Sequence, residues 1–533
     1  MASCGGGGGG GGCGANCSSS AADDAPEERL GRLSIATGAA ATCGKCGVGA
    51  VVVVAGGVGL CGECLRAHLF GKFKLAVTSN AMVRPTDSVL LAFSGGPASR
   101  VALQFIHDMR SKAVESWDAS NSQALPVFDV GVAFVDESAL LSKPRREVEL
   151  AIADIKSIVS SILPSDKAMH ITPLEDVFSS ESNGREGRLR ELVGMINDDT
   201  GREDLLQCLR MLSLQKIALE NGYAKIMLGS CASAIACHVL SATVKGQGYS
   251  LPADVQYVDT RWEVPVVLPL RDCLAQELSL LCELDSLKTQ QLLDRPCSGI
   301  NGLVASFVAR LREENPSREH TVVRTAQKLK PFSFNKFSAN GYHDFLPSRL
   351  RPKFQNVDSD ESTLSEVLCL ICQSPFSESE LQNLESTKHK PQKKIDLYTA
   401  YCCQSCHFQI LPGGANMYDQ FFSLLPKFWT ERVDTATASQ SSLSGTTSVL
   451  SNPIDMSLEA FLSIGNAIVH YYAYYHKQQR RGFSLVVASS ESPSAAIPYQ
   501  RDFSLVALSE SHHQSISCSH TDQDGGGPMP MAP

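Results

Sequence analysis

The sequence predicts an α/β fold in which a parallel sheet is flanked along the chain by two zinc-knuckle modules. Two observations lead to this prediction. Between residues 81 and 335, short apolar runs of strand length alternate with longer segments of helical periodicity, the pattern of βαβ units with helices on both faces of a sheet. Paired C-x2-C motifs, a common spacing of thiolate metal ligands, stand before and after this region.

Length and charge restrict the class of protein. The chain has 533 residues, of which 43% are hydrophobic, so it can form several domains with sizeable cores. Its formal net charge is -9, so a nucleic-acid partner must be held by local basic patches. The first residues lack the pattern of a secretory signal, and the apolar run at 50–60 is broken by glycines and too short to cross a bilayer. We expect a cytoplasmic protein with no membrane partner, whose 19 cysteines are reduced or bound to metal.

The first 80 residues are expected to contain a disordered leader and a metal module. Residues 1–40 are rich in glycine and bury too little apolar surface to fold. Residues 41–80 contain two C-x2-C pairs separated by fourteen residues, and we expect a zinc site formed by Cys43, Cys46, Cys61 and Cys64. The alternative, four small buried apolar side chains, does not explain two matched pairs.

A basic and aromatic stretch follows the second cysteine pair. It consists of Arg66, His68, Lys72 and Lys74, interleaved with Phe70 and Phe73. Such a stretch can contact RNA phosphates and stack on bases, or it can be the solvated face of a helix. The sequence leaves both alternatives open.

In residues 81–335, four strands are predicted in order. They are the apolar runs at 89–93, 126–135, 170–171 and 224–228. Helical spacing of apolar residues predicts one helix directly after the first strand and others at 145–163, 205–220 and 303–311. Residues 179–204 are polar and rich in glycine, so we expect a loop there.

The first predicted strand ends in Ser94-Gly95-Gly96, and a helix follows. Glycines let backbone amides crowd around an anion, and the positive end of the helix faces the same point, so this loop is a candidate phosphate site. Ordinary βα turns share this sequence and are the alternative. The second strand ends in Asp136 and the fourth is followed by Gly229, so both lie at the carboxyl edge of the sheet, where such folds bind ligands.

A strand that ends in SGG, followed by Ser99 and by a second strand that ends in Val135-Asp136-Glu137, resembles the PP-loop ATP pyrophosphatases. The resemblance implies a Rossmann-like PP-loop core. In active members this loop cradles the pyrophosphate of ATP while a carbonyl-type oxygen is adenylated. The positions that match the nucleotide site are Ser94, Gly95, Gly96, Ser99 and Asp136.

Three departures from the family pattern imply that this nucleotide site is vestigial. Active members carry SGGxDS, whereas Pro97-Ala98 stand between the glycines and Ser99 here. The family's thiolases carry a C-x2-C pair where this chain has only Cys208, and their Gly-His-Asn motif is replaced by residues 229–233, GSCAS. We therefore assign no catalytic residue, and the resemblance leaves open whether ATP is bound.

The resemblance implies a non-catalytic subunit of a tRNA sulfurtransferase complex. Such a subunit supports 2-thiolation of wobble uridine (5-methoxycarbonylmethyl-2-thiouridine) in cytosolic tRNAs. It would bind tRNA and form a heterodimer with a catalytic PP-loop thiolase that takes sulfur from a thiocarboxylated ubiquitin-like carrier.

Two alternative functions stay open. One is a self-sufficient ATP-dependent tRNA sulfurtransferase in which Cys208 or Cys231 carries sulfur, although Cys231, Cys237 and Cys297 also fit ordinary buried packing. The other is a zinc-knuckle interaction scaffold without nucleotide binding.

The rest of the chain is expected to contain a connector (336–365), a second metal module (366–430) and a Ser-rich linker, helix and flexible tail (431–533). The module contains two C-x2-C pairs separated by thirty residues, which predicts a second zinc site at Cys369, Cys372, Cys403 and Cys406. Cys402 and His407 are alternative ligands. Basic runs at 318–330 and 388–394 are candidate tRNA contacts or solvated surface.

Overall fold

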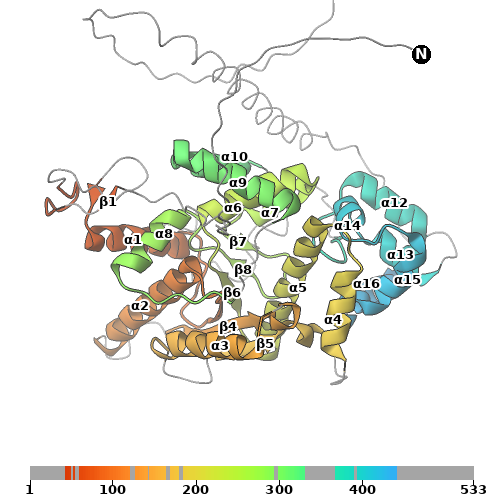
Figure 1. Cartoon of the computed structure of the whole chain (residues 1–533), viewed down its shortest axis with the longest axis horizontal. Coiled ribbons are helices and arrows are strands. Elements are labelled where there is room, and N and C mark those ends of the chain that lie inside the picture. The colour runs from red at the N-terminus through yellow and green to blue at the C-terminus, as the bar shows by residue number, and fades with distance from the viewer. Residues whose placement is uncertain are drawn as a thin grey trace, which may run out of the picture. The chain divides into compact units, whose positions relative to one another are not determined.

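A computed structural model describes residues 42–49, 52–53, 59–119, 127–141, 143–163, 169–178, 184–292, 298–329, 367–388 and 393–440 (Figure 1). The predicted leader, the connector, Cys297 and the tail beyond residue 440 lie outside the described residues. In the described part of the chain, no helix is both long enough and apolar enough to span a bilayer.

Six strands form the central sheet. In spatial order they are β5 (Met169–Pro173), β4 (Asp129–Asp136), β3 (Ser88–Ala92), β6 (Lys225–Leu228), β8 (Val266–Val267) and β7 (Val258–Asp259). Neighbouring strands are parallel except β7, which pairs antiparallel with β8. The predicted parallel sheet is confirmed, and the four predicted strands correspond to β3, β4, β5 and β6. Strands β7 and β8 are too short to leave a periodic signal in the sequence.

Helices cover both faces of the sheet, as predicted for continuous apolar strands. On one face, Val89 and Leu91 pack with α1 (Gly62–Ser79), α2 (Pro97–Ala119), α3 (Arg145–Ser160) and α8 (Ala275–Leu284). On the other face, Leu90 packs with α5 (Asp199–Glu220), α6 (Ala232–Val244) and α10 (Ser317–Ala326). Helix α9 (Gly299–Glu314) packs against α6 through Val304 and Val308.

The prediction of a loop over residues 179–204 is wrong. Residues Arg185–Gly194 form helix α4, and α5 begins at Asp199. The Asp198 carboxylate accepts a hydrogen bond from the Gly201 amide at 2.8 Å and so caps α5. Leu189 and Leu192 of α4 are fully buried against C-terminal residues. Tertiary burial therefore stabilises a helix whose polar, glycine-containing sequence gives little local signal.

The second cysteine module consists of α12 (Glu378–Lys388), α13 (Lys394–Ala400), α14 (Gln404–Gln409), α15 (Tyr418–Leu424) and α16 (Lys427–Gln440). Its apolar residues form one core with α4 and the first half of α5. Phe421 and Trp429 are buried there, in agreement with the apolar pattern of the sequence.

Polar contacts fix the module to the sheet domain. The Arg188 guanidinium donates to the carbonyls of Ser423 at 2.7 Å and Leu425 at 3.0 Å. The Ser405 hydroxyl donates to the Lys245 carbonyl at 3.0 Å. The Lys245 ammonium in turn pairs with Asp204 of α5 at 2.7 Å. Helix α5 therefore packs against both the sheet and the cysteine module.

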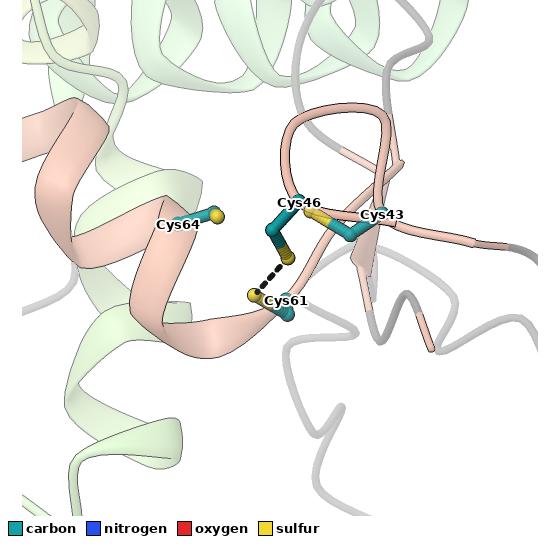
Figure 2. Close-up of side chains that lie close together, drawn as sticks. All are labelled: Cys43, Cys46, Cys61 and Cys64. Atoms are coloured by element: carbon teal, nitrogen blue, oxygen red, sulfur yellow. Dashed lines mark hydrogen bonds between the residues drawn. The ribbon is translucent and has the colours of Figure 1, made fainter. Parts of the chain in front are cut away.

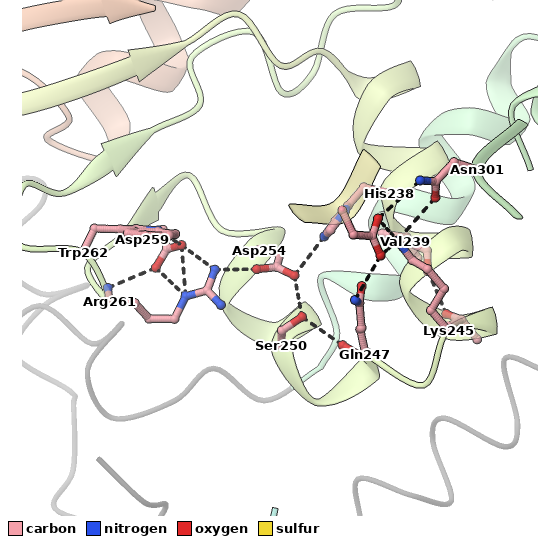
Figure 3. A network of polar contacts seen from close by, with 12 residues as sticks. His238, Val239, Lys245, Gln247, Ser250, Asp254, Asp259, Arg261, Trp262 and Asn301 are labelled. Carbon is pink, nitrogen blue, oxygen red and sulfur yellow. Dashed lines mark hydrogen bonds and ion pairs between the residues drawn. The ribbon is translucent and has the colours of Figure 1, made fainter. Parts of the chain in front are cut away.

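A buried polar network closes the excursion between α6 and β8 (Figure 3). The Asp254 carboxylate contacts the Ser250 hydroxyl at 2.7 Å, His238 Nε2 at 2.9 Å and the Arg261 guanidinium. Burial alone would raise the pKa of Asp254, but Arg261 and His238 hold that pKa well below its usual range. Because Ser250 and His238 bond to the same carboxylate rather than to each other, this is a structural clamp and not a Ser-His-Asp relay.

The close approach of α5 and α14 gives a stability prediction. A Cβ on Gly201 would lie 1.8 Å from the Gln409 carbonyl oxygen, whereas a Cβ on Gly187 of α4 would meet nothing within 4 Å. Gly201→Ala should lower the free energy of unfolding by about 1–3 kcal/mol through overpacking. Gly187→Ala, the matched control, should leave it unchanged or raise it by about 0.5 kcal/mol.

Urea unfolding of the full chain, followed by circular dichroism, measures both variants. Equal stability of Gly201→Ala and the unsubstituted protein would contradict the packing of α5 against α14.

Candidate functional site

The Ser-Gly-Gly loop connects β3 to α2 at the carboxyl edge of the parallel sheet, where the sequence places it. The loops after β4, at Asp136, and after β6, at Gly229, follow the two strands that flank β3. A Cβ on Gly229 would lie 2.9 Å from the backbone of Ser99, so the β6 loop packs tightly on the first turn of α2. The structure therefore gathers the predicted site residues at one edge of the sheet.

The serines of the loop bond within the loop. The Ser99 hydroxyl, only 4% exposed, accepts a hydrogen bond from the Ser94 amide at 3.3 Å and donates one to the Gly96 carbonyl at 3.0 Å. It also lies 3.2 Å from the Ser94 hydroxyl. Because these groups satisfy one another, the loop keeps its shape without an external anion.

A segment that follows α8 lies directly on the two glycines. We name this segment, Leu287–Leu292, the strap. The Gln290 amide donates to the Gly95 carbonyl at 3.0 Å. Gly95 has a φ of +82°, and a Cβ there would lie 1.7 Å from the Gln290 carbonyl oxygen, while a Cβ on Gly96 would lie 2.4 Å from Gln291 Nε2. The glycines are thus needed for the approach of the strap, a contact that the polar sequence at 288–291 did not indicate.

The acidic residues that end β4 are both engaged. Asp136 Oδ1 accepts a hydrogen bond from the Ser138 amide at 2.9 Å, at the start of the short 3-10 helix Ser138–Leu140. Glu137 is 1% exposed and forms a two-pronged ion pair with Arg210 of α5, which also contacts Glu203 at 3.0 Å. Burial opposes the charged form of Arg210, but Glu137 and Glu203 raise the pKa of Arg210 above its ordinary value.

The loop after β6 is covered by α10. Ser233, in the first turn of α6, donates from its hydroxyl to Glu319 Oε2 at 2.6 Å and accepts from the Ala275 amide at 3.0 Å. Glu319 is 1% exposed, and burial raises the pKa of its carboxyl. The sequence analysis missed Glu319, because it stands in a basic stretch whose pattern indicates a solvated helix.

The two cysteines considered as sulfur carriers lack the features of reactive thiols. Cys231 is 4% exposed, and burial raises its pKa. Burial likewise raises the pKa of Cys208, which packs in the core shared by α5 and the cysteine module. A reactive cysteine has a lowered pKa and an accessible sulfur, and neither residue fits that description.

The first predicted metal site is assembled (Figure 2). The sulfurs of Cys43, Cys46, Cys61 and Cys64 lie within 4.8 Å of one another. A tight turn carries the first pair, with Gly47 at a φ of +74°, and Cys61 begins α1. Hydrogen bonds from the backbone of Cys46 and Cys61 lower the pKa of Cys43 to about 6, whereas contacts with the neighbouring thiols raise the pKa of Cys64, so the grouping of the four sulfurs is what indicates a metal site.

The second predicted metal site is assembled as well. The sulfurs of Cys369, Cys372, Cys403 and Cys406 lie within 4.8 Å of one another, and the Cys403 amide donates to the Cys369 sulfur at 3.2 Å. The alternative ligands lie outside this group: Cys402 contacts the Tyr398 carbonyl at 3.4 Å, and the His407 ring packs edge-on to Tyr418. Both four-sulfur groups could hold a metal, and this donor set suits zinc or an iron-sulfur cluster.

Of the two alternatives left open for the α1 stretch, base stacking by its aromatic residues does not agree with the structure. Phe73 is 0% exposed, and Phe70 packs edge-on to Phe105 at 5.3 Å. The cations Arg66 and Lys72 pair with acidic groups of α2, α8 and the turn after α8, namely Asp108, Asp285 and Glu277. The α1 aromatics therefore serve packing, whereas His68 and Lys74 of the same helix are exposed, as are Arg324 and Lys328 at the end of α10.

The comparisons with known proteins identify the family. Cytoplasmic tRNA 2-thiolation protein 2 from Oryza sativa subsp. indica is 81% identical over 417 residues, which cover 78% of this chain and 89% of the relative. The chain belongs to the cytoplasmic tRNA 2-thiolation protein 2 family. The member of this tRNA 2-thiolation family from Arabidopsis thaliana is 50% identical over 374 residues, which cover 70% of this chain and 81% of that relative. No family model matches the sequence.

Membership of the tRNA 2-thiolation protein 2 family agrees with the tRNA 2-thiolation that the sequence resemblance implied. The name of the relatives describes them as cytoplasmic, in agreement with the expected location. Among solved structures, the U34-tRNA thiolase NcsA from Methanococcus maripaludis with its 4Fe-4S cluster shares 17% identity, with a TM-score of 0.41 over 54% of this chain and 87% of that chain.

The two cysteine groups give a prediction on metal content. Cys369→Ser should remove the metal of the second group and leave that of the first, so the metal per chain should fall by half. Cys402→Ser, the matched control, changes the neighbouring thiol and should leave the metal content unchanged. Elemental analysis of the purified full chain measures both.

The second group lies in the core shared with α4 and α5, so Cys369→Ser should also lower the thermal midpoint. Full metal content in Cys369→Ser, or loss of metal in Cys402→Ser, would show that the ligands are wrongly assigned.

Proposed function

We propose that this chain is a non-catalytic subunit required for 2-thiolation of wobble uridine in cytosolic tRNAs. Family membership supports the process, because the relatives are named for tRNA 2-thiolation. The observation that supports a non-catalytic role is the carboxyl edge of the sheet. Pro97-Ala98 stand where active PP-loop ATP pyrophosphatases carry a carboxylate, and Ser94, Ser99 and Glu137 are bonded within the chain.

Pro97-Ala98 provide no carboxylate to organise metal and phosphate, and Cys208 and Cys231 are not accessible low-pKa thiols, so the described residues at this edge supply neither half of an adenylation and sulfur-transfer reaction. A catalytic partner must supply both. We propose a heterodimer with a PP-loop thiolase that takes sulfur from a thiocarboxylated ubiquitin-like carrier, in keeping with the family resemblance of the sequence.

The proposed contribution of this chain is to bind tRNA and to complete the complex. Its overall charge of -9 does not attract RNA, so binding depends on local cations. Arg324 and Lys328 are exposed at the end of α10 and fit this role. In the second basic run, Lys394 pairs with Asp434 at 2.7 Å and fits it less well.

We propose zinc at both cysteine groups. Four sulfurs with no open position are typical of a structural zinc site, which stabilises a small module and takes no part in chemistry. Cys43, Cys369, Cys403 and Cys406 are buried and Cys372 is half-buried, whereas Cys46 is exposed.

A second candidate function is an interaction scaffold that binds neither nucleotide nor RNA. The covering of Gly95 and Gly96 by the strap favours the loss of nucleotide binding, which this candidate shares with the first. Binding of tRNA separates the two.

Complementation tests the proposed function. In an Arabidopsis line that lacks its own tRNA 2-thiolation protein 2, the tagged full chain should restore 2-thiouridine, measured by mass spectrometry of tRNA nucleosides. It should also co-purify with a PP-loop thiolase. Cys208→Ser and Cys231→Ser should restore thiolation as well as the unsubstituted chain.

Loss of thiolation in a folded Cys208→Ser or Cys231→Ser variant would favour the self-sufficient sulfurtransferase. Failure of the unsubstituted chain to restore thiolation, with no thiolase recovered, would reject the proposed function.

A further inference from the structure

We propose that the strap is a built-in ligand of the Ser-Gly-Gly loop, which holds it in the place of phosphate, so that this chain binds no nucleoside triphosphate there. The inference deepens the proposed function and rests on it for the meaning of the loop. It assigns the occupant of the site: residues of this chain itself.

The first support is the position of the Gln290 carbonyl. Its oxygen occupies the space next to Gly95 that a Cβ would fill, at the start of the 23-residue helix α2. An anion cradle of this kind presents amide groups and the positive end of a helix to an oxygen. The Gln290 carbonyl oxygen carries partial negative charge and lies at this helix terminus, and the hydrogen bond that joins the two segments runs from the Gln290 amide to the Gly95 carbonyl at 3.0 Å.

The second support is burial of the glycines. Gly95 and Gly96 are both buried, and Gln291 Nε2 occupies the space next to Gly96. A pyrophosphate on these glycines would have to displace the Gln290 carbonyl and the Gln291 side chain together. The backbone of Gln290 and the side chain of Gln291 therefore fill the site together.

The third support is that the strap is held at both ends. At its start, the Leu287 amide donates to the Cys282 carbonyl at 2.8 Å. At its end, Leu292 is 2% exposed and packs in the core formed by α1, α2 and α8. Asp285, just before the strap, pairs with Arg66 of α1 at 2.8 Å. Displacement of the strap would disturb this core as well as the loop.

The degenerate residues fit a permanent occupant. Pro97 has no amide hydrogen to offer an anion, and Ala98 has no carboxylate to hold a magnesium ion. A nucleotide would therefore have to compete with the strap, and it would lack two of the groups that bind it in active PP-loop ATP pyrophosphatases. The two glycines are still needed, because the strap packs against their backbone.

Hydrogen exchange and calorimetry on the full chain test the proposal. The Gln290 amide should be protected from exchange, and saturating Mg·ATP should change neither that protection nor the thermal midpoint. Titration with Mg·ATP should give no binding heat. Saturable binding of Mg·ATP, or loss of Gln290 protection when it is added, would overturn the proposal.

A pair of variants isolates the strap contact. Gly95→Ala places a methyl group on the Gln290 carbonyl and should abolish protection of the Gln290 amide. Gly222→Ala is the matched control, because Gly222 has a similar φ of +71° but a Cβ there meets nothing within 4 Å. It imposes similar backbone strain and should leave the protection intact. Equal protection in both variants would contradict the contact.

These results separate the proposal from the proposed function. A chain that binds Mg·ATP and still restores thiolation only as a subunit would overturn the built-in ligand alone. A chain whose Gln290 amide is protected, and which binds no nucleotide but fails to restore thiolation, would overturn the proposed function alone.

Discussion

The contact of Gln290 with Gly95 is the constraint on which the carboxyl edge of the sheet depends. It joins the loop after β3 to the end of α8, and it requires a residue without a side chain at a φ of +82°. Around it, Ser99 fixes the loop from within and Gly229 packs on the first turn of α2. After the neighbouring strand β6, Glu319 of α10 accepts a hydrogen bond from the Ser233 hydroxyl of α6. Each of these groups lies near the carboxyl edge of the sheet, where α/β proteins of this type bind their ligands.

Helix α5 is the second element that links distant parts of the chain. Its first half packs against the second cysteine module, and its second half packs against the sheet. Arg210, in the middle, holds the buried Glu137 at the end of β4. A metal at Cys369, Cys372, Cys403 and Cys406 would therefore stabilise the position of α5 and, through Arg210, the end of β4. Under this arrangement the second metal supports the fold rather than the chemistry.

Sequence reasoning predicted the features with a strong local or spacing signal. The strands β3 and β4 are continuous apolar runs, and both cysteine groups follow from paired C-x2-C spacing. It missed α4, whose Leu189 and Leu192 are buried in a core that includes residues more than two hundred positions later in the chain. It left RNA contact and a solvated helix face open for the α1 aromatics and did not foresee that Phe73 is buried, because an aromatic residue among cations has the same pattern in a core helix as on a stacking surface. The strap and Glu319 are polar residues whose role depends on contacts across the fold, and neither leaves a signal in the sequence.

The central claim is that residues of this chain fill the carboxyl edge of its own sheet. The most direct measurement is an experimental structure of the full chain in saturating magnesium and a non-hydrolysable ATP analogue. The account predicts the Gln290 carbonyl on Gly95 and the Glu319 carboxylate on Ser233, with no nucleotide at the loop. Phosphate groups bound on Gly95 and Gly96, with Gln290 and Gln291 displaced, would contradict it.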